Sequence, residues 1–397
     1  MVASLRKAFN QNFTRERYEA FLADLTSKHP GAIEFRVAET PIFADRHFTK
    51  KMTDACESIV DIITGTDFKK LTARAIPPGE NVAAETPHSH MIAFDFGVCI
   101  NDNGELEPQL IEMQGFPTLF GFQVYYPEVL EKHFDIPGNY SHYLNGYNKN
   151  SYVAMLRKLL LGEHNVENVI LLEIKPHEQK TRIDFYCTQD YTGVKPVCLT
   201  ELFAEGNNLF YMNEGKKTAV KRIYNRVIFD ELKSRNDLGN IIDITKQWNV
   251  EWIPHPNWFY RISKFTLPFI KNPFVPETFF LSDIKQMPAD LENYVLKPLF
   301  SFAGQGVVID VTQGDINSIK DPENWILQRK VKYADVIETP DIPAKAEIRI
   351  MYVWPDNEAR PHPAINLARL SKGKMIGVRY NAEKEWVGGS VCYFETY

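Results

Sequence analysis

The sequence predicts a mixed α/β (α+β) protein in which helices cover sheets made mainly of antiparallel strands. Two observations predict the strands. A pair of apolar segments is joined by the turn Asn101-Asp-Asn-Gly104, and a glycine-containing loop separates two β-type segments near residue 300. A third observation predicts helices, because residues 1–75 repeat apolar side chains at helical spacing.

Length and composition fit an ordinary globular protein. The 397 residues suffice for roughly two or three domains, and 44% of them are hydrophobic and 24% charged. The net charge of −6 argues against a protein that binds nucleic acid through bulk positive charge. No apolar run in the sequence is long enough to span a membrane, and the five scattered cysteines fit a reducing compartment. We therefore expect a cytoplasmic protein; the sequence leaves its oligomeric state open.

Two helices are predicted near the beginning of the chain. The first starts at Thr14, carries Tyr18, Phe21 and Leu25 on one stripe, and ends before Pro30-Gly31. The second covers residues 47–64. Neither segment carries a chemical signature, so both are interpreted as packing elements.

Residues 91–100 and 107–114 are predicted to form a hairpin that carries polar groups on apolar strands. Asp95 interrupts the first strand, and Glu112 and Gln114 leave the same face of the second because they are two residues apart. Two carboxylates and a carboxamide are oxygen ligands of the kind that Mg²⁺ accepts. The alternative is a solvated polar face of the sheet.

A separate α/β unit is predicted to begin near residue 166. Strand-like segments at 169–174 and 183–187 alternate with helical stretches, and the segments at 193–199 and 219–228 add further strands. The last segment carries Lys221, Arg222 and Arg226, for which a solvated edge strand is favoured over contact with an acidic substrate. Loops at 115–150 and 195–215 are expected to contribute to substrate specificity, although their aromatic residues could equally serve packing.

The segment 294–309 is predicted to be a flap over an anion. Lys297 leads into a loop with Ser301, Gly304, Gln305 and Gly306, and glycine lets backbone N–H groups converge on a phosphate. The alternative is a plain glycine-containing hairpin. Upstream, Lys264 stands near the start of a helix predicted to run to about residue 270, where it could reach a phosphate. Residues 325–331 are predicted to be a buried strand that offers its backbone to an adenine edge.

The C-terminal part of the chain is predicted to gather arginines on one sheet face. Glu347 and Arg349 share a face of one strand, and Arg369, Arg379 and Asn381 follow on segments 364–371 and 375–381. Arginines beside carboxylates suit phosphoryl transfer, where catalysis rests on positioning and charge neutralisation. A ladder of salt bridges across the strands is the alternative.

In this order the motifs resemble the ATP-grasp superfamily in a circularly permuted arrangement, as in glutathionylspermidine synthetases and eukaryotic glutathione synthetases. The lysine, the flap, the adenine segment and the arginine strands follow the family's order, whereas Asp95 and Glu112-x-Gln114 come from the front of the chain. The resemblance implies two lobes, each an antiparallel sheet with helices, which clasp ATP beside a small α/β pre-ATP-grasp domain. The front strands would then lie next to the C-terminal ones.

The resemblance implies four parts and a set of site residues. Residues 1–160 would hold the N-terminal helices and the metal-binding strands of the C-lobe, 161–260 the small α/β domain, 261–335 the ATP-binding lobe with its flap, and 336–397 the remaining C-lobe strands. Arg369 and Arg349 would be catalytic, and Asp95, Glu112 and Gln114 would bind Mg²⁺. ATP would contact Lys264, Lys297, Ser301, Gly304, Gln305, Gly306, Gln328, Lys330, Val331 and Asp335.

The implied activity is that of an ATP-dependent carboxylate–amine ligase acting through an acyl phosphate on small-molecule or peptide substrates. A small-molecule kinase of ATP-grasp type and a nucleotide-binding pseudoenzyme remain alternatives. Gln114 stands where the family usually has Asn, which keeps an amide oxygen on a side chain one methylene longer. Ala93 stands where permuted relatives often have Arg, so the resemblance leaves open whether the glutathionylspermidine reaction itself carries over. Arg74 and His90 are candidates to replace that arginine. His88-x-His90 has no third zinc ligand in register.

Overall fold

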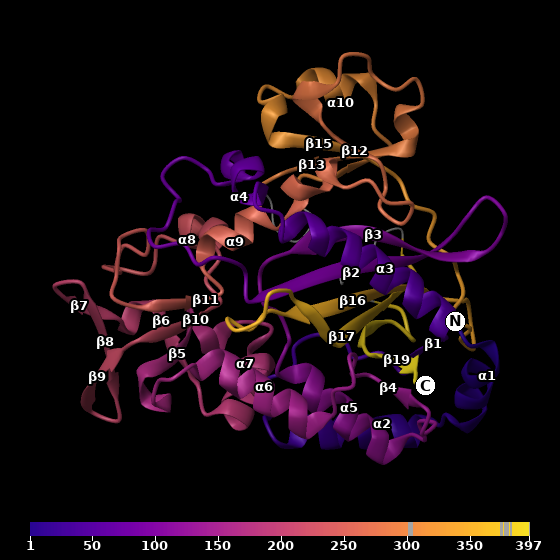
Figure 1. Cartoon of the computed structure of the whole chain (residues 1–397). Coiled ribbons are helices and arrows are strands. Elements are labelled where there is room, and N and C mark those ends of the chain that lie inside the picture. Colours follow the sequence, from indigo (N-terminus) through magenta and orange to yellow (C-terminus); the bar gives the residue numbers. More distant parts are fainter. Residues whose placement is uncertain (301–304, 374–375, 377–380, 382, 397) are drawn as a thin grey trace.

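A five-stranded antiparallel sheet lies at the centre of the computed structural model, which describes residues 1–300, 305–373, 376, 381 and 383–396 (Figure 1). Its strand order is β18-β17-β16-β2-β3, with β2 at Met91–Ile100 and β3 at Leu106–Gln114. The other strands are β16 at Lys345–Val353, β17 at His362–Ser371 and β18 at Gly388–Ser390. The predicted hairpin 91–114 is confirmed, and β2 pairs with β16, so the front strands do lie beside the C-terminal ones.

A second antiparallel sheet lies above the central sheet in Figure 1. Its order is β12-β15-β13-β14, with bounds Thr278–Phe280, Trp325–Arg329, Tyr294–Pro298 and Val308–Ile309. Strands β13 and β14 form the predicted hairpin, since Val295 faces Ile309 and Leu296 faces Val308. Ser301 and Gly304 of the predicted flap lie outside the described residues. Helix α10 (Gln313–Ser318) packs over this sheet through Ile316.

A parallel sheet of order β11-β10-β5-β6 forms the third layer. Its strands are β5 (Val169–Glu173), β6 (Lys195–Cys198), β10 (Arg222–Asn225) and β11 (Glu251–Ile253). Helices α6 (Lys149–Leu161) and α7 (Arg182–Thr192) pack against it. The predicted strand at 183–187 is wrong, because these residues belong to α7 and its apolar side chains are buried on one helix. A small antiparallel meander, β7 (Phe203–Glu205), β8 (Asn208–Asn213) and β9 (Lys216–Val220), projects from its edge (Figure 1).

The predicted solvated edge strand at 219–228 is wrong. The segment splits into the end of β9 and the whole of β10, and β10 lies between β5 and β11. Arg222 and Arg226 are buried, and each has an acidic partner: Arg222 pairs with Glu251, and Arg226 with Asp184. The charges of this strand are therefore neutralised inside the protein, whereas only Lys221 is exposed.

Helices from the first part of the chain cover the remaining faces. The predicted helices are confirmed as α2 (Arg15–Ser27), whose N-cap Thr14 accepts a hydrogen bond from the Arg17 amide, and α3 (Arg46–Ile63). Helices α1 (Ala3–Asn12), α4 (Phe68–Leu71) and α5 (Phe122–His133) complete the group. A small sheet of β1 (Ile42–Ala44), β19 (Cys392–Glu395) and β4 (Tyr140–Ser141) ties the two ends of the chain together.

The connection between the parallel sheet and the upper sheet differs from prediction. Helices α8 (Phe229–Ser234) and α9 (Pro256–Arg261) are short, and the predicted helix after Lys264 is a 3-10 helix over Lys264–Phe269. Pro268 lacks the amide hydrogen that a longer helix would need. Of the predicted segment 375–381, Arg379 lies outside the described residues. Among the helices that the structure describes, none is both long and apolar enough to cross a bilayer.

Candidate active site

A buried ion pair between β2 and β16 forms the centre of the candidate site. Asp95 and Arg349 face each other in the sheet register, and both side chains are buried. Arg349 donates from Nε and Nη2 to the two carboxylate oxygens of Asp95 at 2.5 and 2.6 Å. Burial is the largest influence and acts to raise the pKa of Asp95. The charge and hydrogen bonds of Arg349, with the charge of Arg369 and a hydrogen bond to Glu112, together outweigh burial and hold the pKa below its ordinary value.

A second pair adjoins the first on the same face of the sheet. Glu347 is two residues from Arg349 and faces Arg369 of β17. Arg369 donates to Glu347 Oε1 and, at 3.0 Å, to Asp95 Oδ2. Burial raises the pKa of Glu347 despite the nearby charge of Arg369. The two pairs thus form one network of two carboxylates and two guanidinium groups.

Tyr333 closes one side of this network. Its hydroxyl lies 3.3 Å from Glu347 Oε2, and its ring packs on Gly97 of β2. A Cβ on Gly97 would lie 2.7 Å from the Tyr333 ring, so this approach depends on glycine. The sequence contains no signal for Tyr333. An isolated backbone bridge to Cys99 of β2 places Tyr333 beside this network.

Strand β3 brings the other two predicted metal ligands to the same place. Glu112 faces Asp95 across the β2–β3 ladder and is half-buried. Gln114, with its amide oxygen turned toward β16, accepts hydrogen bonds from Nη1 and Nη2 of Arg349 at 2.8 and 2.9 Å. Asp95, Glu112 and Gln114 are therefore brought together, and Arg349 lies between two of them.

Lys297 links the upper sheet to the central sheet beside Glu112. Its ammonium group donates to the side-chain oxygen of Gln328 at 2.5 Å and to the backbone oxygen of Ile111 at 3.2 Å. Burial lowers the pKa of Lys297, while Glu112 and Glu347 act in the opposite direction. Lys264 shares the interaction with Glu112, and burial lowers the pKa of Lys264 to about 8 although Glu112 favours its charged form. Both predicted phosphate-binding lysines thus face the acidic strand.

The remaining predicted nucleotide-binding residues surround β13–β15 and the segment that follows. Gln328 is buried with its Nε2 atom unpartnered among the described residues. Lys330 donates to the Glu292 backbone and to Asp310, and Asp335 pairs with Lys345 at 3.2 Å. Val331 is half-buried, and Gln305 and Gly306 are exposed at the base of the hairpin. Between Gln328 and Asp335 the chain passes from the upper sheet to β2, where the Ala334 amide donates to Val98.

The donor chemistry of Asp95, Glu112 and Gln114 fits Mg²⁺, since all three offer oxygen atoms from neighbouring strands. Among the described residues, no three His, Cys, Asp or Glu side chains are grouped so as to hold a metal ion. The predicted set differs from such a group because its third member is an amide. Both oxygens of Asp95 accept hydrogen bonds from Arg349, so a cation at Asp95 would lie beside the positive charge of this guanidinium group.

Four other residues singled out in the sequence have structural roles away from this network. Arg74 lies over the Phe265 and Phe280 rings, and His90 contacts Asp356 at 2.8 Å, so Arg349 rather than either of them accompanies Asp95. His88 stacks on Trp354. Asn381 bonds to the Lys372 amide and Ser371 at the end of β17.

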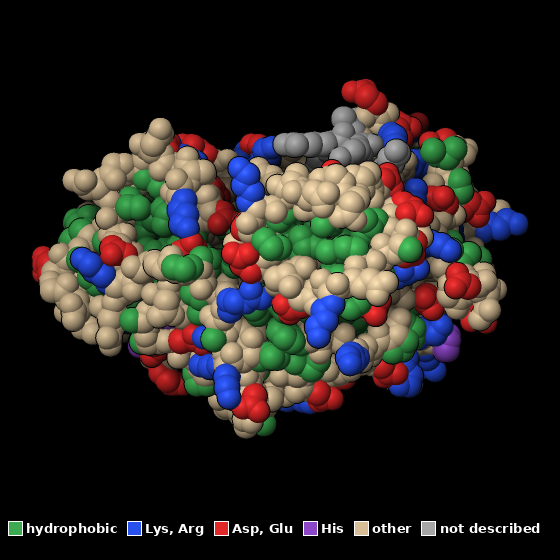
Figure 2. Space-filling model, turned by 90° about the horizontal axis from the view of Figure 1, so that it is seen from above, with side chains coloured by type: hydrophobic (Ala, Val, Ile, Leu, Met, Phe, Trp, Pro, Cys, Tyr) green, Lys and Arg blue, Asp and Glu red, His purple; other side chains and the backbone are tan. Residues whose placement is uncertain are grey.

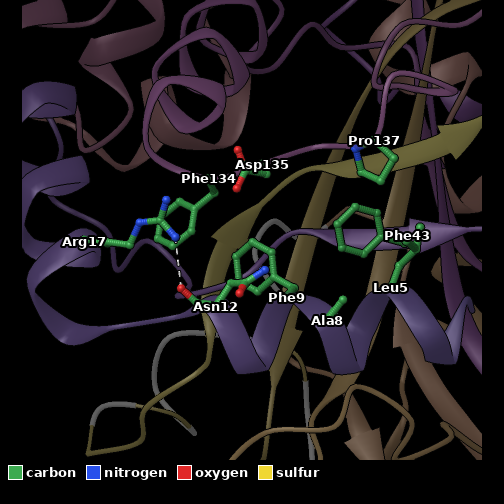
Figure 3. A pocket seen from close by; sticks show the side chains of 9 residues that line it. All are labelled: Leu5, Ala8, Phe9, Asn12, Arg17, Phe43, Phe134, Asp135 and Pro137. Atoms are coloured by element: carbon green, nitrogen blue, oxygen red, sulfur yellow. Dashed lines mark hydrogen bonds between the residues drawn. The ribbon is translucent and has the colours of Figure 1, made fainter.

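The surface and the pockets add little to this site. Figure 2 shows acidic and basic side chains interspersed on the face seen from above. The positively charged groups of the site, such as Arg349 and Lys297, are buried or half-buried and do not form a basic surface patch there. Figure 3 shows a pocket between α1 and the end of α5, lined by Phe9, Phe43 and other residues outside the site. Its volume is about 60 Å³. It is far smaller than the roughly 300–1,000 Å³ of typical ligand pockets.

The fold is a mixed α/β architecture with several antiparallel sheets, of the kind found in glutathione synthetase-like proteins. The chain is similar in structure to the apo form of a glutathione synthetase-like effector from Globodera pallida, with a TM-score of 0.58 over 96% of each chain and 11% sequence identity. At this identity the likeness shows the fold alone. No family model matches the chain, and no curated protein matches it in sequence.

Proposed function

We propose that this protein is an ATP-dependent carboxylate–amine ligase of the circularly permuted ATP-grasp type. The observation that carries the proposal is the meeting of two segments at one site: Lys297 of the upper sheet donates to the backbone of Ile111, next to Glu112 and across from Asp95 and Arg349. A lysine-bearing lobe opposite paired carboxylates and arginines suits the transfer of a phosphoryl group.

ATP would lie between the two antiparallel sheets. Lys297 and Lys264 would bind its phosphates under the β13–β14 hairpin, and the segment from Gln328 through Lys330, Val331 and Asp335 would hold its adenosine part. Asp95, Glu112 and Gln114 would hold Mg²⁺, which supplies charge neutralisation at phosphate oxygens. Closure of the hairpin would exclude water from the reacting atoms.

The chain's own cations would carry the chemistry. An oxygen of the substrate carboxylate attacks the γ-phosphorus, the bond to ADP breaks, and an acyl phosphate forms. Arg369 and Arg349 stabilise the negative charge on the transferring group. The amine nitrogen then attacks the acyl carbon, the carbon–oxygen bond to phosphate breaks, and the amine releases a proton. The products are an amide, ADP and phosphate.

Nucleotide binding and trapping of the intermediate test this proposal. Mg·ATP should bind in a calorimetric titration, and hydroxylamine added with ATP and a panel of carboxylic acids should yield a hydroxamate from the acyl phosphate. Glu112→Ala should abolish ADP and hydroxamate formation, whereas Glu105→Ala, an exposed residue of the neighbouring turn, should leave both unchanged. A stable phosphorylated product without hydroxamate would indicate a kinase, and absence of Mg·ATP binding would overturn the proposal.

A nucleotide-binding protein without catalysis is the second candidate. The contact of both Asp95 oxygens with Arg349 favours it, because a metal-dependent enzyme needs that carboxylate. Mg·ATP binding that is unaffected by Glu112→Ala, together with no ADP formation on any carboxylate, would favour this candidate over the ligase.

A further inference from the structure

Asp95 is held entirely by side chains in the described part of the chain. Its Oδ1 accepts from Arg349 Nε, and its Oδ2 accepts from Arg349 Nη2 and Arg369 Nη2 at 2.6 and 3.0 Å. Its exposed fraction is 1%. A carboxylate so deeply buried requires a cation nearby, because an unpaired charge in such a place is strongly unfavourable.

Arg349 is placed where a cation shared by the predicted ligands would lie. One edge of its guanidinium contacts Asp95, and two of its nitrogens face the amide oxygen of Gln114 at 2.8 and 2.9 Å. Asp95 and Gln114 stand on adjacent strands, where Gln114 is opposite Ala93, two residues from Asp95 along β2. The group that neutralises Asp95 in this structure is therefore part of the chain.

Side-chain contacts of this kind can be exchanged without disturbing the sheet. The backbone ladder β3-β2-β16 holds Asp95, Glu112 and Arg349 in register whatever their side chains contact. Arg349 is a long side chain with many rotamers, and Glu347 lies two residues away on the same face as a further carboxylate. Moving Arg349 thus costs its own contacts but no strand pairing.

We propose that Arg349 is a built-in counter-ion of Asp95 that competes with the divalent cation for the same carboxylate. Asp95 then takes one cation at a time: Arg349 in the free protein, and the metal once nucleotide brings it. Free divalent cations alone bind weakly, which couples metal uptake to nucleotide. This inference rests on the proposed function, since it assumes that Asp95, Glu112 and Gln114 are the metal ligands.

Mn²⁺ binding without nucleotide tests the competition. Electron paramagnetic resonance should show Mn²⁺ bound at least tenfold more tightly to Arg349→Met than to the unaltered protein. Thermal unfolding should show a lower Tm for Arg349→Met that Mn²⁺ largely restores, while Mn²⁺ leaves the Tm of the unaltered protein unchanged. The double variant Asp95→Asn, Arg349→Met should lose both effects, because the disputed carboxylate is gone.

A matched control and a second variant keep the test decisive. Arg360→Met removes another arginine paired with two carboxylates, Glu57 and Asp61, and should not gain Mn²⁺ affinity. Arg349→Lys keeps a charge but has only one nitrogen, so its Mn²⁺ affinity should fall between those of Arg349→Met and the unaltered protein. If Arg349→Met does not fold, equal Mn²⁺ affinity in Arg349→Lys and the unaltered protein overturns the inference.

The two proposals fail in different ways. Tight Mn²⁺ binding by the unaltered protein without nucleotide, or no gain in either Arg349 variant, overturns the competition but leaves the ligase proposal standing if Mg·ATP binds. Absence of Mg·ATP binding to the unaltered protein overturns the proposed function, whatever Mn²⁺ does in the variants.

Discussion

Two buried aspartate–arginine pairs, one in each large region of the molecule, are held in opposite ways. Asp95 of the central sheet accepts hydrogen bonds from the side chains of Arg349 and Arg369, and Glu112 contributes a further side-chain hydrogen bond. Asp184 of α7, beside the parallel sheet, accepts from the backbone amides of Leu119, Gly121 and Phe122, and Arg226 adds one contact at 3.3 Å.

The electrostatics of the two aspartates differ accordingly. Burial raises the pKa of Asp184 although Arg226 and the amides oppose it. At Asp95 the interactions with Arg349, Arg369 and Glu112 together outweigh burial and lower the pKa. Backbone donors at the start of α5 cannot leave without unfolding that helix, but side-chain donors can move. The comparison indicates that the parallel-sheet pair stabilises the fold and that the central-sheet pair can respond to ligands.

The largest expected effect is a difference in how much stability the protein loses when each aspartate is replaced by asparagine. Asp184→Asn should lower the free energy of unfolding by about 4 kcal/mol, because it leaves Arg226 uncompensated and turns an amide donor toward buried N–H groups. Asp95→Asn should cost no more than about 2 kcal/mol, since Glu347 and Gln114 remain as partners of the arginines. Urea denaturation of both variants measures the difference. Similar losses would remove the contrast on which the comparison rests.

The second effect concerns nucleotide affinity, and only the central region should show it. Lys297→Met should weaken ATP binding about 30-fold, roughly 2 kcal/mol, because a charged hydrogen bond to phosphate is lost. Adenosine, which has no phosphate, should bind the variant and the unaltered protein alike. Lys195→Met at the parallel sheet, where Lys195 pairs with Glu214, serves as the control and should leave ATP binding unchanged. Calorimetric titration would contradict the assignment if both lysine variants behaved the same.

The third effect is a pH dependence of stability that arises in the parallel-sheet region. Burial raises the pKa of Glu173 to about 8, against the charge of Arg226. Because the folded-state pKa exceeds the ordinary 4.5, the folded form binds the extra proton, and this stabilisation is lost as the pH rises from about 4.5 to 8. Glu173→Gln should remove about 1–2 kcal/mol of that decline between pH 5 and 8. Urea denaturation of both proteins across this pH range measures the decline. If the free energy of unfolding fell equally with pH in Glu173→Gln and in the unaltered protein, the prediction would be wrong.

The smallest effect is a pH dependence of binding in the central region. Burial lowers the pKa of Lys264 to about 8, below the ordinary 10.5. ATP affinity should therefore fall about three- to tenfold between pH 7 and 9 as Lys264 loses its proton, and Lys264→Met should flatten this change. Stability should move the other way, rising with pH between about 8 and 10.5, because the unfolded chain then binds more protons. The exposed Lys271 offers the control substitution.

Local patterns predicted the elements whose signals are local. Thr14 caps α2, and the Asn101–Gly104 turn joins β2 to β3 with Gly104 at a φ of +79°, a conformation that glycine adopts readily. The segment 219–228 is not a solvated edge strand, because Arg222 and Arg226 pair with acidic residues distant in sequence, Glu251 and Asp184. A sequence that mixes basic and apolar residues does not distinguish a solvated edge strand from a strand whose charges form buried ion pairs.

The candidate site was predictable in its residue types and not in its contacts. Asp95 and Arg349 were both singled out, yet only the β2–β16 register places them directly opposite each other. The contact changes their interpretation, since the predicted metal ligand and the predicted catalytic arginine bind each other through two hydrogen bonds. Tyr333 could not be predicted from the sequence, because its position depends on the space that Gly97 leaves beside β2. The predicted domain bounds, ATP, Mg²⁺ and the substrates stay predictions.

The pairing of β2 with β16 has a consequence for biosynthesis. A ribosome adds roughly 5–20 residues per second, so the β2–β3 hairpin emerges tens of seconds before β16 can cover it. During this interval β2, whose residues Met91–Cys99 are all buried in the finished fold, presents an open apolar edge to the surroundings. Expression at low temperature or with added chaperones should therefore raise the yield of correctly assembled protein.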